Sequence, residues 1–70
     1  MFVFLERPDE WRGRVLTEMA QALESMSWMY LRLGDDKLNR RYIVAHYWLV
    51  DLIAAEVAIG TIQLPQPEGA

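Results

Sequence analysis

Cysteine is absent from the 70-residue sequence, and histidine occurs only once, as His46. Without cysteine the chain can form no disulfide, no thiolate–zinc site and no thiol nucleophile. If His46 lies on a helix, none of the residues three or four positions away is a carboxylate that could orient its imidazole. We therefore expect no enzymatic activity, no catalytic residue, no metal and no cofactor, and we assign His46 to the core or to a dimer interface.

Basic residues are also scarce. Seven Lys and Arg residues stand against ten Asp and Glu residues, which gives a formal net charge of -3. An acidic chain lacks the basic footprint expected of a nucleic-acid-binding protein. One positive cluster keeps a nucleic-acid-binding regulator open as an alternative function. It comprises Arg32, Lys37, Arg40 and Arg41.

Long uninterrupted apolar runs are missing as well. Residues 1–5 are apolar, but a signal peptide needs about 7–15 apolar residues after a basic start. Residues 42–60 approach the length of a membrane span, but they contain Asp51 and Glu56. Each carboxylate would cost about 2.5–3.5 kcal/mol at mid-membrane. We expect no transmembrane span and a cytoplasmic protein. The remaining membrane alternative is a peripheral protein anchored through Phe2, Val3 and Phe4.

Hydrophobic residues make up 53% of the chain, and most of them recur at helical spacing. Residues 8–33 are predicted to form a helix, because Pro8 suits the first turn, where its missing N–H needs no partner. Apolar residues then recur at alternating steps of four and three, which is the pattern of a heptad seam. Gly13 is the weak point, costing about 1 kcal/mol relative to alanine. The seam consists of Val15, Met19, Ala22, Met26, Met29 and Leu33, and Leu16, Leu23 and Tyr30 widen it.

A second helix is predicted over residues 36–60. Gly34 suits the left-handed position that follows a helix, and Asp35 or Asp36 can cap the next one through its carboxylate. Because the turn at residues 34–36 is so short, the second helix has to return antiparallel beside the first.

The predicted second helix is apolar almost all the way round between Tyr42 and Ile59. Such a helix is surrounded by protein rather than lying on a surface, and one neighbouring helix cannot cover it. We therefore predict an all-α, antiparallel two-helix hairpin, a single domain over residues 1–70, that dimerises into a four-helix bundle. The residues assigned to the core or the dimer interface are Val15, Met19, Met26, Met29, Tyr42, His46, Leu49 and Ile53.

The two chain ends, residues 1–7 and 61–70, are predicted to be extended, and a hairpin brings them to the same end of the molecule. Residues 61–64 alternate polar and apolar side chains, as a short strand does. Two arrangements stay open at this point. The ends pair as a two-stranded ribbon through residues 2–5, or their apolar side chains cap the core.

Large aromatic residues occupy helix positions that should face water. Trp28 interrupts the polar face of the first helix, and Tyr47 and Trp48 interrupt that of the second. Trp, Tyr and Arg dominate interface hot spots because they bury large area and still satisfy their polar tips. We predict a surface that binds a partner protein, with the dimer interface as the alternative role. Its members are Trp28, Leu31, Arg32, Arg40, Arg41, Val44, Tyr47, Trp48 and Asp51.

Two helices joined by Gly34-Asp35-Asp36 resemble Rop-type hairpins, which dimerise into four-helix bundles. The size, acidity and exposed aromatic patch resemble the small phage-encoded antagonists that disable a bacterial host protein, such as the quorum-sensing anti-activators of LuxR-type regulators. This resemblance implies a homodimer in the host cytoplasm that inhibits or redirects a partner, such as a transcriptional regulator, by surface binding. The helix face that Rop uses to bind RNA has a different composition here, so RNA binding is not implied.

Overall fold

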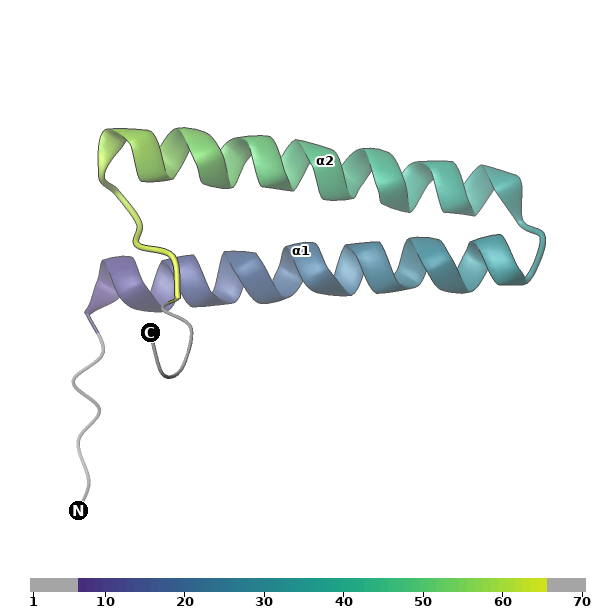
Figure 1. Ribbon diagram of the computed structural model, residues 1–70, viewed down its shortest axis with the longest axis horizontal. Coiled ribbons are helices and arrows are strands. Elements are labelled where there is room, and N and C mark those ends of the chain that lie inside the picture. The colour runs from purple at the N-terminus through teal and green to yellow at the C-terminus, as the bar shows by residue number, and fades with distance from the viewer. Residues whose placement is uncertain (1–6, 66–70) are drawn as a thin grey trace, which may run out of the picture.

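The computed structural model describes residues 7–65 and consists of a hairpin of two long helices (Figure 1). α1 spans Pro8–Arg32 and α2 spans Asp36–Ile59. The helices lie side by side and antiparallel, and the segment after α2 returns to the end of the hairpin where α1 begins. Residues 7–65 contain no strand. The all-α hairpin predicted from the sequence is confirmed, and its dimerisation stays a prediction.

Local sequence explains where α1 begins. Arg7 precedes the helix in an extended conformation, and no side chain caps the first N–H groups. Pro8 occupies the first turn, where it sacrifices no hydrogen bond. Asp9 and Glu10 place negative charge beside the positive end of the helix dipole. Asp9 also lies 3.3 Å from the Arg7 guanidinium.

Both helices end in a Schellman motif built on a glycine. Gly34 and Gly60 have φ angles of 77° and 83°, a left-handed conformation that glycine adopts without steric cost. In each case the N–H of the next residue, Asp35 or Thr61, donates to a carbonyl of the last helical turn, at 2.9 and 3.0 Å. As a result α1 ends at residue 32 and α2 at residue 59, each one residue before the end expected from the sequence.

Asp35 connects the turn to α2, because its carboxylate accepts a hydrogen bond from the Leu38 backbone N–H at 3.0 Å. The substitution Asp35→Ala is expected to lower the free energy of unfolding by about 0.5–2 kcal/mol, since it removes the cap of an N-terminal donor. A urea titration followed by circular dichroism measures this loss. Asp36→Ala is the matched control, because Asp36 lies in the same turn and is not the capping residue. An equal loss in both variants would contradict a role for the cap.

α1 packs against α2 and the C-terminal segment along a stripe that mixes small and large side chains. Gly13, Ala20 and Ser27 recur every seven residues and are buried, so the α1 backbone can approach its neighbours closely. The Ser27 hydroxyl donates to the Glu24 carbonyl at 2.7 Å, which satisfies it inside the contact. The contact stripe consists of Gly13, Leu16, Ala20, Leu23, Ser27 and Tyr30.

This contact stripe corrects the sequence-based assignment for α1. The predicted seam lies about one third of a turn away round the helix, and most of it is left uncovered by the hairpin. The prediction from the sequence followed the large apolar side chains. Two helices, however, interdigitate best where large and small residues alternate. Gly13 is therefore part of the contact rather than a weak point. Met19, Ala22, Met29 and Leu33 are exposed, and Val15 and Met26 are half-buried.

The buried core is small and centred on α2. Leu49 and Ile53, both assigned to the core from the sequence, are 4% and 9% exposed. They pack with Ala20 of α1 and with Ile62, which follows α2. Three more leucines pack around this cluster without being fully buried: Leu16, Leu23 and Leu52.

Contacts near the turn set the register between the helices. Tyr42 is half-buried and stacks on Tyr30, with ring centroids 5.4 Å apart and planes 9° from parallel. The Asn39 side-chain amide donates to the Ser27 carbonyl at 2.7 Å. Residues near position 28 of α1 are therefore level with the first turns of α2.

Residues 61–65 fold back across the N-terminal part of α1 (Figure 1). Ile62 enters the core and is 2% exposed. The Gln63 backbone N–H donates to the Asp9 carbonyl at 3.2 Å, and the Gln63 side-chain amide donates to the Asp9 carboxylate at 2.9 Å. This segment therefore caps the open end of the hairpin. The alternative ribbon with residues 2–5 lies outside the described residues, as do residues 1–6 and 66–70 of the ends predicted to be extended.

Candidate interaction surface

All nine residues of the predicted partner-binding surface are exposed on the hairpin. Trp28 is 57% exposed and Trp48 is 66% exposed. Large exposed apolar area marks binding sites more often than inert surface. The other seven residues are Leu31, Arg32, Arg40, Arg41, Val44, Tyr47 and Asp51.

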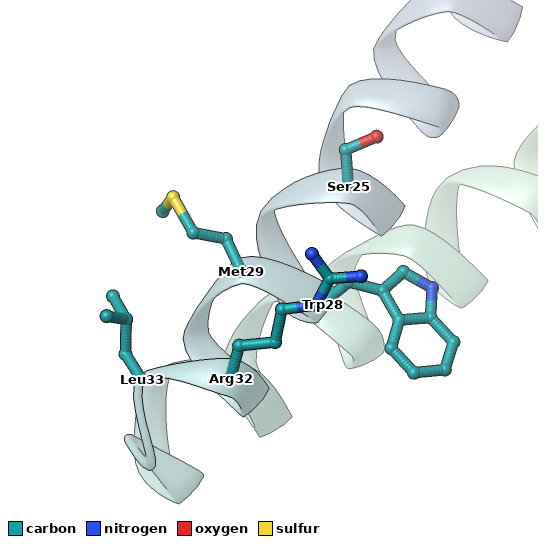
Figure 2. A pocket seen from close by; sticks show the side chains of 5 residues that line it. All are labelled: Ser25, Trp28, Met29, Arg32 and Leu33. Atoms are coloured by element: carbon teal, nitrogen blue, oxygen red, sulfur yellow. The ribbon is translucent and has the colours of Figure 1, made fainter.

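One part of this surface lies in a shallow groove of about 740 Å³ near the C-terminal end of α1 (Figure 2). Ser25, Trp28, Met29, Arg32 and Leu33 line it. Figure 2 shows the Trp28 indole projecting to one side of the helix and Met29 and Leu33 to the other, with Arg32 between them. The groove combines an aromatic ring, aliphatic side chains and a guanidinium, so it can bury an apolar side chain and pair with a carboxylate.

The sequence pointed to Trp28 and Arg32 but missed their neighbours in the groove. The heptad pattern predicts that Met29 and Leu33 belong to the seam of the helix, and no sequence pattern singles out Ser25. The sequence does contain a signal for this groove. Trp28 and Arg32 are four residues apart, as are Met29 and Leu33, and residues four apart are neighbours on a helix surface.

The basic residues form a second groove over the first turns of α2. Asp36, Lys37, Arg40 and Arg41 line it. Arg32, grouped with them in the sequence, lies in the α1 groove instead. A phosphate in the α2 groove would therefore meet three cations and one carboxylate. This arrangement weakens the electrostatic basis of the nucleic-acid alternative.

Trp48 and Trp28 do not belong to one cluster. His46 contacts Ala20, and the helices are antiparallel, so Trp48 is level with α1 residues about ten positions before Trp28. At a rise of about 1.5 Å per residue, the two tryptophans are separated by roughly 15 Å along the hairpin. The single patch predicted from the sequence is thus divided between the two helices. Its exposed α2 members are Val44, Tyr47, Trp48 and Asp51, beside the two arginines of the α2 groove.

His46 links the two helices. Its Nδ1 lies 2.8 Å from the Ala20 carbonyl oxygen, which can only accept, so Nδ1 carries a hydrogen and donates it. Its Nε2 lies 3.6 Å from a carboxylate oxygen of Glu24, and its ring meets Tyr47 edge-on at 5.3 Å. None of the residues three or four positions from His46 on α2 is a carboxylate, as the sequence shows, and the nearby carboxylate comes instead from Glu24 of α1.

The two carboxylates that interrupt the apolar surface of α2 have different surroundings. Asp51 is exposed, whereas Glu56 is half-buried and accepts a hydrogen bond from the Thr61 hydroxyl. Within residues 7–65, no group of three or more His, Asp and Glu side chains is placed to hold a metal ion.

α2 is long and apolar enough to cross a membrane by length and composition alone. Only 11% of its most apolar segment is buried within the hairpin. A core helix of a soluble protein passes the same test, so this observation is weak evidence for a membrane span. It does establish that most of the apolar surface of α2 is uncovered in the single chain.

No protein-family model, curated protein or solved structure matches this chain. The hairpin and its exposed side chains therefore carry the functional argument.

Proposed function

We propose that this protein is a small non-enzymatic binding module that docks its exposed aromatic and arginine side chains on a partner protein and inhibits or redirects it. One observation carries the proposal. In residues 7–65, fourteen large hydrophobic side chains are exposed, whereas only four hydrophobic side chains form the buried core. A soluble domain with so little buried and so much exposed apolar surface gains stability from contact with other protein.

The α1 groove is the best-equipped part of this surface. Trp28 supplies a large rigid anchor, and Arg32 beside it can hold a carboxylate through two parallel hydrogen bonds. We propose that the partner presents an apolar side chain next to an Asp or Glu. The protein itself is acidic, so a local basic contact of this kind also gives the docking a preferred orientation.

The proposed partner is a bacterial regulator, and the proposed setting is the cytoplasm of a phage-infected host. The support for this step is the resemblance in size, acidity and hairpin layout to small phage-encoded antagonists. A protein that acts by covering a surface needs no catalytic group, which agrees with the composition of the chain.

Affinity capture from a bacterial lysate, with three matched baits, tests the proposed function. The Trp28→Ala bait is expected to capture at least tenfold less of the partner than the wild type. The reason is that truncating an interface tryptophan commonly costs roughly 2 kcal/mol or more of binding free energy. Trp11→Ala is the control, since Trp11 is similarly exposed, at 52%, on the same helix but outside the groove. Circular dichroism should show equal helicity in all three baits. Equal capture by wild type and Trp28→Ala would overturn the role of the groove.

A second candidate function is association with a membrane surface, and the uncovered apolar surface of α2 is the observation that favours it. Co-sedimentation with phospholipid vesicles separates the two candidates. Binding to vesicles without any protein partner would support the membrane candidate, and its absence would remove it.

A further inference from the structure

Two contacts between the helices distinguish the two broad faces of the hairpin. The His46 imidazole lies 3.6 Å from the Glu24 carboxylate, and the Asn39 amide donates to the Ser27 carbonyl at 2.7 Å. Each residue turns a helix by about 100°, so Glu24 lies to one side of the contact stripe on α1. His46 lies to one side of the buried Leu49 on α2. Because Glu24 and His46 meet, these two sides form one face, which we call the polar face.

The remaining sides of both helices form the opposite face. On α1, Met19 and Met26 lie on the side of the contact stripe away from Glu24, and on α2, Val44 and Trp48 lie on the side of Leu49 away from His46. We call this the methionine face. Its members are Val15, Met19, Ala22 and Met26 of α1 and Val44, Trp48, Ala55 and Ile59 of α2.

The two faces differ in composition. The α1 side of the polar face carries Thr17, Gln21 and Glu24 and continues to Trp28, and its α2 side carries Ile43 and Val50. The α1 side of the methionine face is apolar without interruption from Val15 to Met26, whereas the charged Arg41 and Asp51 lie on its α2 side beside Val44 and Trp48. The methionine face therefore presents an unbroken apolar stripe on α1, bordered by two charged side chains on α2.

We propose that the methionine face is covered by the methionine face of a second copy of this chain. The four α1 members recur at steps of four, three and four, and this spacing continues to Met29 and Leu33. An unbroken heptad repeat packs against another helix of like periodicity. A two-fold axis between two hairpins supplies such a helix, because each copy then meets the same surface of the other.

The uncovered area agrees with what a stable dimer requires. Met19 is 50% exposed, Val44 and Trp48 are both 66% exposed, and Ile59 is 73% exposed. A large side chain at this level of exposure presents on the order of 100 Å². Together with the smaller or half-buried Val15, Ala22, Met26 and Ala55, these side chains supply most of the roughly 800 Å² that each partner of a stable complex buries.

The stability of a single hairpin favours a second copy over a different partner. A cysteine-free domain of this size has a marginal core and gains stability when its exposed apolar surface is covered. That gain matters from the moment of synthesis, and the partner that is always present then is another copy of the chain. The Trp28 indole projects away from Met29 and Leu33 (Figure 2), so a dimer of this kind leaves Trp28 accessible in both copies.

Light scattering and sedimentation equilibrium test this proposal on the full chain. The wild type is expected at twice the 8.2 kDa chain mass. Met19→Glu should halve the measured mass, because it places a charge in the centre of the methionine face. Val50→Glu is the matched control on the polar face, 39% exposed, and should remain dimeric. Both sites are exposed, so near-unchanged helicity is expected at concentrations where the hairpin stays folded.

The outcomes that overturn the proposal are a monomeric wild type, a Met19→Glu variant that stays dimeric, and loss of the dimer in Val50→Glu. A monomer in buffer that sediments with phospholipid vesicles would likewise overturn it in favour of a lipid surface. If Met19→Glu unfolds, single-cysteine variants of this cysteine-free chain keep the test decisive. With a bis-maleimide reagent, Ala22→Cys should cross-link two chains much faster than Gln21→Cys, its neighbour on the other side of the helix. Equal rates would contradict the proposed face.

Discussion

Replacing Leu49 with alanine is expected to unfold most of the protein at room temperature. Leu49 is 4% exposed and is one of only four buried hydrophobic residues, with Ala20, Ile53 and Ile62. A buried Leu→Ala substitution costs about 2–5 kcal/mol, because burial is lost and a cavity remains. A core of this size rarely supplies more than about 3–5 kcal/mol of net stability. The loss is therefore comparable to the whole stability of the fold.

Thermal and urea unfolding, followed by circular dichroism at 222 nm, measure the effect of Leu49→Ala. Val50→Ala is the matched control, because Val50 is the next residue of the same helix and is 39% exposed. It should lose less than about 1 kcal/mol, as exposed substitutions usually do. A Leu49→Ala variant as stable as Val50→Ala would mean that the core is not centred on this residue.

Gly13→Ala is expected to destabilise the protein, although helix propensity alone predicts the opposite. In a helix interior, alanine is more favourable than glycine by about 0.5–1 kcal/mol. Here, however, a Cβ at residue 13 would overlap the Gln63 carbonyl oxygen and lie 2.8 Å from the Gln63 carbonyl carbon. These are backbone atoms, so the C-terminal segment has to leave α1.

Undocking this segment exposes Ile62, which is 2% exposed in the fold, and breaks the Gln63 hydrogen bonds to Asp9. Exposing an isoleucine costs about 1.5–3 kcal/mol, which exceeds the propensity gain. The net expectation for Gly13→Ala is a loss of about 1–2 kcal/mol, the difference between these two effects.

A double-mutant cycle separates the two effects. In a chain that ends at Gly60, the contact with Gln63 is absent, and Gly13→Ala should stabilise the helix by about 0.5–1 kcal/mol. The same substitution in the full chain should destabilise it. Urea unfolding of the four proteins measures both changes. A stabilising effect in both backgrounds would show that the C-terminal segment does not pack on residue 13.

How much of the fold the sequence predicts depends on whether the signal is local. The turn follows from Gly34 and Asp35, since a left-handed residue and a capping carboxylate act within one or two turns of the chain. Pro8 likewise marks the start of α1. These local signals located both helices to within one residue at each end.

The face of α1 that meets α2 was not predictable in the same way. Val15, Met19 and Met26 form a stronger apolar pattern than Gly13, Ala20 and Ser27, yet the small residues make the contact. Two different stripes on one helix can each form a well-packed contact. Which stripe contacts α2 depends on the shapes of the side chains that α2 and the C-terminal segment present to α1. The same limit explains why Glu24 was not expected beside His46, because the two are 22 positions apart in the sequence.

By itself, the sequence determined an all-α antiparallel hairpin, its turn, and aromatic side chains in excess of what the hairpin buries. Only the tertiary structure decided that Trp28 lies in a groove with Met29, Arg32 and Leu33, that Trp48 lies elsewhere, and that Ile62 closes the core. The physical reason is that helix formation and capping are governed by neighbours within a turn or two. The choice between competing apolar faces is governed by packing between segments far apart in the chain.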